Sequence, residues 1–225
     1  MKTVSVAIDG PAGAGKSTIA RRLASQLGFR YVDTGAIYRT VAYFMDLWGV
    51  SPKDADGVNR YIDELTVGIE YDEDGLQHMI MNGMDVTGDI RTQDISQKAS
   101  LISAHACVRE MLLDMQRDLA KQYNVIMDGR DIGTVVLPKA TVKIFLTASA
   151  EVRAKRRCEE LLAKGQKAKY ETVLKEIQQR DYQDTHREIA PLKMARDSIK
   201  VDTSEMNVDE VVAAILKIVR EKAGL

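Results

Sequence analysis

The chain has 225 residues, of which 45% are hydrophobic and 29% charged, as in a folded globular protein of one domain with insertions or two small domains. Its 32 Lys and Arg against 33 Asp and Glu give a net charge of −1, so no overall field draws it to nucleic acid or an anionic membrane. Cys107 and Cys158 lie far apart, which argues against a disulfide scaffold or zinc site, and apolar stretches of strand length predict neither a membrane span nor a signal peptide.

The first predicted elements are a strand, a glycine-rich loop and a helix. Residues 3–8 form a β-branched run typical of a buried strand, and apolar residues recur at helical spacing over residues 19–27. Between them, residues 10–17 fit the pattern G-x-x-x-x-G-K-[ST] of a phosphate-binding loop, in which Lys16 reaches the outer phosphates and the Ser17 hydroxyl can ligate magnesium. The residues expected to bind ATP are Gly10, Pro11, Ala12, Gly13, Ala14, Gly15, Lys16, Ser17 and Thr18.

A second strand and two helices are predicted next. Residues 30–32 indicate a short strand, and a helix is expected from about residue 36 to residue 47. Thr34 could cap this helix or serve a ligand, and Arg39 could meet a phosphate or be a solvated helix charge. Residues 52–65 also look helical, with Ser51 as the N-cap and Pro52 at the first helical position.

Residues 66–103 interrupt this alternation of strands and helices. Residues 67–71 and 76–81 predict two strands, Asn82-Gly83 is a tight-turn signal, and residues 84–86 predict a third strand. An antiparallel meander inside a chain of parallel type indicates an insertion. We therefore expect a core domain formed by residues 1–65 and 104–225, and an inserted subdomain at 66–103.

The core pattern then returns. An amphipathic helix is expected around residues 108–119, followed by strands at 124–128, 142–146 and 198–201. The last helix begins at Asn207, which with Glu210 forms a capping box. About five strands alternating with helices predict an α/β fold, a parallel sheet flanked by helices.

Candidate functional side chains follow the predicted strands. Asp128 ends an apolar strand, where it could hold a metal directly or through water, a role we favour over simple turn chemistry. Arg130 and Asp131 come directly after it, at the sheet edge where open α/β sheets bind ligands; the alternative is a surface salt bridge. His78, His105 and His186 are scattered and predict no histidine-based metal site.

A late arginine-rich segment predicts either a closing lid or a solvated surface. Arg180, Asp184 and Arg187 lie on one face of a predicted helix, and Arg153, Arg156 and Arg157 cluster on an earlier one. A polar break at residues 165–169 separates the two helices. A lid over residues 153–187 would bring cations to a transferring phosphoryl group, but the spacing leaves both interpretations open.

With these residues collected, the chain resembles the bacterial cytidylate kinases, a family of phosphate-loop nucleoside monophosphate kinases. The resemblance rests on residues 8–18, 33–39, 91–93 with Ser100 and Arg109, 128–136, and 180–187. It implies the phosphate-loop type of five-stranded parallel sheet, an insert that forms the monophosphate-binding subdomain, and a helical lid. It also implies transfer of the γ-phosphoryl group of MgATP to CMP or dCMP, directly and in line.

The resemblance further implies a role for each candidate residue. Thr34, Arg39 and Arg130 would hold the acceptor monophosphate; Ser100, Arg109 and Asp131 would face the pyrimidine with Arg187 nearby; Arg180 and Asp184 would bind the ribose hydroxyls. Lys16, Arg130, Asp131, Arg153 and Arg157 would act in catalysis, and Ser17 and Asp128 would hold Mg²⁺. An acid such as Asp131 can accept the amino group of cytosine and would repel the oxygen that uracil presents there.

Two other classes of function remain as alternatives: a phosphate-loop kinase for another monophosphate or small acceptor, and a non-catalytic ATP-binding module. The arginine-rich closing segment argues against the second, because a pure binding module has no use for it. We expect a monomer in the cytoplasm whose partners are ATP and CMP or dCMP, with no nucleic acid and no membrane.

Overall fold

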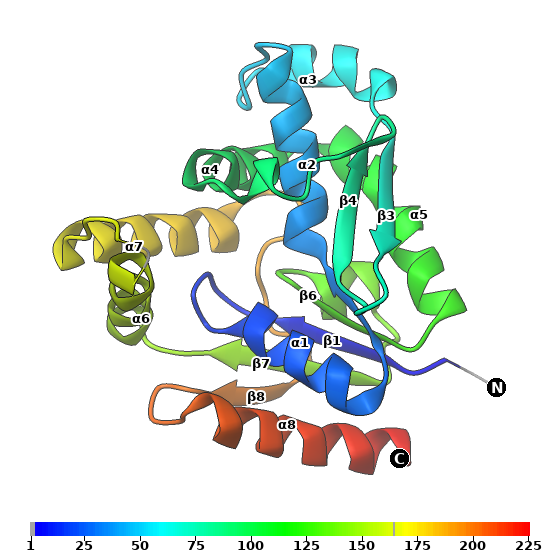
Figure 1. Ribbon diagram of the computed structural model, residues 1–225, viewed down its shortest axis with the longest axis vertical. Helices are drawn as coiled ribbons and strands as arrows, with labels where there is room; N and C mark the ends of the chain where they lie inside the picture. Colours follow the sequence, from blue (N-terminus) through cyan, green and yellow to red (C-terminus); the bar gives the residue numbers. More distant parts are fainter. Residues whose placement is uncertain (1–2, 164) are drawn as a thin grey trace.

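Five parallel strands form the central sheet of the computed structural model, which describes residues 3–163 and 165–225 (Figure 1). The strands are β1 (Ser5–Asp9), β2 (Arg30–Asp33), β6 (Val125–Gly129), β7 (Val142–Thr147) and β8 (Ile199–Asp202), in the order β2-β6-β1-β7-β8. The predicted α/β fold is confirmed. Residues 1, 2 and 164, which the predicted core domain and lid include, lie outside the described residues.

Helices cover both faces of this sheet because its strands alternate between two apolar clusters. On β1, Val6 and Ile8 pack on one face with α1 (Lys16–Leu27) and α8 (Val208–Ala223). Ala7, between them, points to the other face, where α2 (Thr34–Leu47) and α5 (Ala106–Gln122) pack. A parallel sheet buried on both faces brings the carboxyl ends of its strands to one edge, where ligands bind in such folds.

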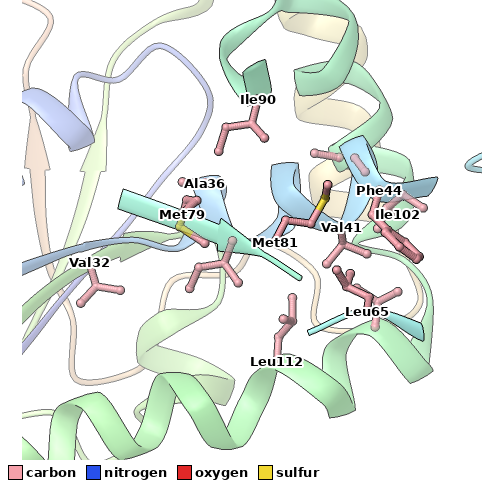
Figure 2. Packing of buried hydrophobic residues seen from close by; sticks show 14 of the residues in the cluster. Val32, Ala36, Val41, Phe44, Leu65, Met79, Met81, Ile90, Ile102 and Leu112 are labelled. Carbon is pink, nitrogen blue, oxygen red and sulfur yellow. The ribbon is translucent and has the colours of Figure 1, made fainter. Parts of the chain in front are cut away.

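A second, antiparallel sheet lies in the predicted insert. Its strands are β3 (Val67–Tyr71), β4 (Gln77–Met81) and β5 (Met84–Asp85), and the β4–β5 turn has positive φ at both Asn82 and Gly83, as the tight-turn signal requires. Figure 2 shows Met79 and Met81 of β4 in the same cluster as Leu112 of α5. The insert therefore shares an apolar core with the main sheet, and its predicted boundaries at 66–103 stay a prediction.

Two of the remaining helices lie with the insert, and two form a separate pair. α3 (Ala55–Tyr61) runs into a short 3₁₀ turn (Ile62–Glu64), and a second such turn (Asp89–Arg91) precedes α4 (Gln93–Ile102). α6 (Ala150–Ala163) and α7 (Tyr170–His186) pack on each other through a small cluster of their own, built on Ala154, Leu161, Val173 and Ile177. In Figure 1 this pair stands opposite the loop between β1 and α1.

The helix starts predicted from local sequence are correct in one case and wrong in another. The capping box of Asn207 and Glu210 at the start of α8 is confirmed. The predicted start of α3 at Pro52 is wrong: residues 51–53 form a turn, because the Asp54 carboxylate accepts the Gly57 N–H and so fixes the first turn later. α2 is capped by Asp33 and not by Thr34, which leaves the threonine hydroxyl available elsewhere.

Among the helices of the described residues, none combines the length and apolar character that crossing a bilayer requires.

Candidate active site

The loop between β1 and α1 is a backbone cradle at the start of a helix. Gly10, Gly13 and Gly15 all have positive φ. A Cβ on Gly10 would lie 1.9 Å from the carbonyl oxygen of Leu146 on β7, so a side chain cannot stand there. No side chain among the described residues caps α1 at Gly15, and the free N–H groups of its first turn can bind an anion.

Lys16 lies in this cradle, with both cationic and anionic side chains near its ammonium group. It is buried, and its Nζ donates to the Pro11 carbonyl over 2.8 Å. Burial, followed by the nearby charge of Arg130, lowers the pKa of Lys16 to about 7, although Asp128 and Asp184 oppose the shift. An anionic ligand would add counter-charge there.

Ser17 and Asp128 form a pair of oxygen donors beside the cradle. The Ser17 hydroxyl donates to Asp128 Oδ2 over 3.0 Å, and the Tyr31 hydroxyl donates to Oδ1 over 2.8 Å. Burial raises the pKa of Asp128, and the carboxylate of Asp33 adds to this effect. Hydroxyl and carboxylate oxygens are the donors that Mg²⁺ takes from proteins, so these residues fit the predicted metal.

The loop after β6 carries Arg130 and Asp131, and it is held from both sides. The Thr34 hydroxyl donates to the Asp128 carbonyl over 2.7 Å. From β1, the Asp9 carboxylate accepts the backbone N–H groups of Ile132 and Gly133 over 2.8 and 2.7 Å. Both contacts join segments that are far apart in the sequence, and together they fix the direction in which the loop presents its charged side chains.

Asp131 lies between two arginines at one end of the cleft. Arg109 donates to its Oδ2 and Arg187 to its Oδ1, while both arginines also bond to Ser103. Burial raises the pKa of Asp131, and the charges of Arg109 and Arg187 oppose that shift. Two guanidinium partners favour the ionised carboxylate, which is a hydrogen-bond acceptor held in one orientation. Ser100, the other residue predicted to face the base, lines the same region.

A cluster of arginines lies between Asp131 and the cradle. Arg130 Nε donates to Asp184 Oδ2 over 2.7 Å, and Arg39 Nη2 donates to Asp33 Oδ2 over 3.0 Å. Burial acts to raise the pKa of Asp184, but the charge and hydrogen bond of Arg130, together with the charges of Arg180 and Arg187, lower the pKa overall.

Two of these arginines keep a buried donor for which the described residues offer no hydrogen-bond partner: Nε of Arg39 and Nε of Arg180. Burial, followed by the charge of Arg130, lowers the pKa of Arg180 to about 10. Buried guanidinium donors without a partner, clustered with further cations, are typical of a site for an anion.

The three arginines predicted for the lid differ in their contacts. Arg153 is buried and donates to the carbonyls of Ala12 and Ala148 and to Asp181 on α7. Arg156 bonds to Thr203, and Arg157 pairs with Glu160 at the surface over 2.8 Å. Arg153 therefore ties the cradle to the α6–α7 pair, whereas the Arg157 side chain is 36% exposed and pairs with Glu160 of its own helix.

One cleft of about 1600 Å³ brings nearly all predicted site residues together. The predicted residues that line it are Ala12, Gly13, Ala14, Gly15, Lys16, Ser17, Thr18, Thr34, Arg39, Ser100, Arg109, Asp128, Arg130, Asp131, Arg153, Arg157, Arg180, Asp184 and Arg187. Gly10 and Pro11 are buried and are not among the lining residues of the described chain.

Several functional side chains were missed by the sequence reasoning. Asp9, Tyr31, Asp33, Ser103 and Asp181 each hold a predicted site residue or its loop. Asp9 and Asp33 carried the only available signal, since each directly follows a predicted strand. The other three show their role only once distant segments are in contact.

Comparison with known proteins gives one consistent family. A family model described as cytidylate kinase matches residues 6–221. The cytidylate kinase of Carboxydothermus hydrogenoformans is 49% identical over 217 residues, which cover 96% of this chain and 97% of the relative. That of Caldicellulosiruptor bescii is 48% identical over 218 residues, with 97% and 96% covered. An uncharacterized protein from Eubacterium ventriosum shares the fold, with a TM-score of 0.52 at 14% identity over 96% of this chain and 98% of that one.

Proposed function

Because this chain belongs to the cytidylate kinase family, we propose that it transfers the γ-phosphoryl group of ATP to CMP or dCMP. The observation that carries the proposal is a single cleft with a phosphate-binding cradle at one end and a doubly paired carboxylate, Asp131, at the other. Between these ends lie arginines with unsatisfied donors, where a phosphate would pass from one nucleotide to the next.

At the donor end, the backbone N–H groups of residues 13–18 hold the ATP phosphates and Lys16 reaches the transferring group. Ser17 and Asp128 would hold the magnesium ion that accompanies ATP. When bound, that ion neutralises charge on the phosphates and orients them. Binding of the anion raises the lowered pKa of Lys16 and so keeps its side chain charged during transfer.

At the acceptor end, Arg39, Arg130 and the Thr34 hydroxyl hold the monophosphate. Arg180 lies beside Arg130 and adds positive charge there, and with Asp184 it binds the ribose hydroxyls. Asp184 Oδ2 is engaged by Arg130, so its other oxygen is the one that meets the sugar. This division of contacts orients the acceptor oxygen toward the donor end.

Base selection rests on Asp131. Its ionised carboxylate accepts the amino group of cytosine, while Arg109 and Ser100 contact other edges of the ring. Uracil presents an oxygen at the same position and is repelled. Leaving a buried carboxylate opposite an acceptor costs a few kcal/mol, enough for about 100-fold discrimination.

The transfer itself needs no strong general base, because the attacking phosphate oxygen is already anionic. Positioning and charge neutralisation supply most of the rate, with Lys16, Arg130 and the lid arginines Arg153 and Arg157 as the cations. The lid over residues 153–187 and the insert at 66–103 close over both nucleotides to exclude water, the competing acceptor. We further propose that the protein is a cytoplasmic monomer, which suits its two free thiols, Cys107 and Cys158, and has no nucleic-acid or membrane partner.

A coupled assay of ADP release across CMP, dCMP, UMP, AMP and GMP tests this function. We expect turnover with CMP and dCMP that exceeds turnover with UMP by about 100-fold at sub-saturating concentration. A preference for AMP or GMP would instead identify a kinase for another acceptor. ATP binding without transfer to any of the five would identify a non-catalytic ATP-binding module.

A further inference from the structure

The β3–β4 hairpin contributes no residue to the lining of the cleft within the described chain. The lining residues run as far as Lys53 and resume at Arg91, so all three strands of the small sheet lie outside. Any effect of the hairpin on a bound nucleotide must therefore pass through another element. Figure 1 shows the hairpin above the main sheet, with the turn between β3 and β4 at its lower end, toward that sheet.

The hairpin makes polar contacts with β2, which is one of the two edge strands of the main sheet. An edge strand has a row of backbone groups that lack a strand partner. Here the Tyr71 hydroxyl donates to the Tyr31 carbonyl over 3.1 Å. Two residues further along β2, Gln77 Oε1 accepts the Asp33 N–H over 2.7 Å, and Gln77 Nε2 donates to the Asp33 carbonyl over 3.3 Å. At Asp33, the Gln77 carboxamide thus makes the two backbone hydrogen bonds that a neighbouring strand would otherwise make.

Asp33 positions the residues that we propose bind the monophosphate. Its Oδ1 accepts the Ala36 N–H and caps α2, and its Oδ2 accepts a hydrogen bond from Arg39. The next residue, Thr34, bonds to the Asp128 carbonyl. A shift of the Asp33 backbone would therefore move the start of α2 and, with it, the guanidinium whose Nε has no partner among the described residues.

The hairpin is also fastened to the start of β2, so that Gln77 is held in place. The Arg30 guanidinium lies 4.9 Å from the ring centroid of Tyr71 and 3.5 Å from that of Tyr123 on the other side. Gln77 Nε2 is further placed by the sulfur of Met79 at 3.0 Å. The carboxamide is thus set in one orientation before any ligand binds.

We infer that Gln77 is a positioning residue for the acceptor phosphate: its carboxamide holds the Asp33 backbone so that Arg39 and Thr34 face the monophosphate. This inference rests on the proposed function of the cleft and assigns part of the insert's contribution to one side chain that no substrate contacts.

The test compares the full-length wild type with Gln77→Met, which keeps the length of the side chain and removes both of its hydrogen bonds to Asp33 as well as the contact with the Met79 sulfur. We expect the KM for CMP to rise about tenfold, which corresponds to the loss of one to two hydrogen bonds. The kcat and the KM for ATP should stay within about twofold of wild type. The preference for CMP over UMP stays unchanged, because Asp131 is not moved. Cytidine, which has no phosphate, keeps its inhibition constant.

Tyr71→Phe is the matched control. It removes a hydrogen bond from the same hairpin to the same strand, but at Tyr31 rather than Asp33, and leaves the ring against Arg30. We expect its KM for CMP to stay within about twofold of wild type. Thermal unfolding of both variants shows whether each is folded at the assay temperature.

Three results would overturn the inference. They are an unchanged KM for CMP in Gln77→Met, a parallel rise in the inhibition constant of cytidine, or an equal rise of KM in Tyr71→Phe. In each of these cases wild-type turnover of CMP would leave the proposed function standing. A wild-type chain that does not phosphorylate CMP would overturn that function and this inference together.

Discussion

The donor end of the cleft is built by one continuous segment, whereas the acceptor end is assembled from side chains of several elements. Residues 10–18 supply the cradle, and positive φ at three glycines shapes it. The acceptor charges come instead from α2, from the loop after β6 and from α7, through Arg39, Arg130 and Arg180. Backbone geometry fixes the donor end, whereas hydrogen bonds between residues far apart in the sequence fix the acceptor end.

This difference shows where each end is vulnerable. The donor end depends first on its own glycines and lysine, with Asp128 and Arg153 as its main contacts from other segments. The acceptor end depends on residues that never meet a substrate, because they hold the backbone from which Arg39 and Asp131 project. Asp9 on β1 joins the two ends, since it precedes the cradle and holds the loop after β6.

The largest effect is expected at the donor end. Lys16→Ala should lower kcat about 10³-fold or more, because the cation nearest the transferring group is lost. The unfolding temperature should not fall, since removal of a buried ammonium relieves its desolvation. Steady-state ADP release and calorimetry measure both. Near-normal turnover would contradict the role of Lys16.

Asp9 offers a pH test of the link between the two ends. Burial raises the pKa of Asp9 from 3.8 to about 6, against the opposing effect of the Gly133 and Ile132 N–H groups. Because the folded-state pKa is the higher one, the contribution of Asp9 to the free energy of unfolding is complete below about pH 4 and is lost as the pH rises through about 6.

Asp9→Asn removes this titration. Relative to the variant, the wild type should lose up to about 3 kcal/mol of unfolding free energy between pH 4 and pH 7. Urea unfolding of both proteins over that range measures the difference, and the shared charged neighbours Asp131 and Lys16 cancel in it to first order. A difference that stays constant with pH would show that Asp9 does not titrate there.

Asp131→Asn tests base selection at the acceptor end. We expect kcat/KM for CMP to fall about 100-fold and the preference for CMP over UMP to shrink to about tenfold or less, because an amide can donate to uracil. Arg109 and Arg187 also lose the charge that pairs them, so stability should be checked by thermal unfolding. Retained preference for CMP would place base selection elsewhere.

The smallest effect is expected in the lid. Arg157→Met should lower kcat about tenfold without changing the unfolding free energy, since its pair with Glu160 is at the surface. Arg153→Met should lower kcat as well, and should in addition destabilise the fold by about 3 kcal/mol, because Asp181 would lose its buried partner. Equal effects of the two changes on kcat and on unfolding would erase this distinction.

Sequence reasoning succeeded where the physical cause is local. The cradle, the strands and the capping box at Asn207 all depend on residues within a few positions of one another. The helix start predicted at Pro52 is wrong, because the side-chain cap at Asp54 makes the helix begin later. Gln77 gave no signal at all, since its role arises from contact with Asp33, 44 residues away.

The chain holds one tryptophan, Trp48, directly after the last residue of α2. Trp48 is 55% exposed, and its ring centroid lies 5.9 Å from that of Phe44 and 5.2 Å from that of Tyr61. Tryptophan emission therefore comes from a single point, at the far end of the helix that carries Arg39. The helix that we propose binds the acceptor phosphate is thus followed by the fluorophore, so nucleotide titrations can report on its surroundings without an added dye.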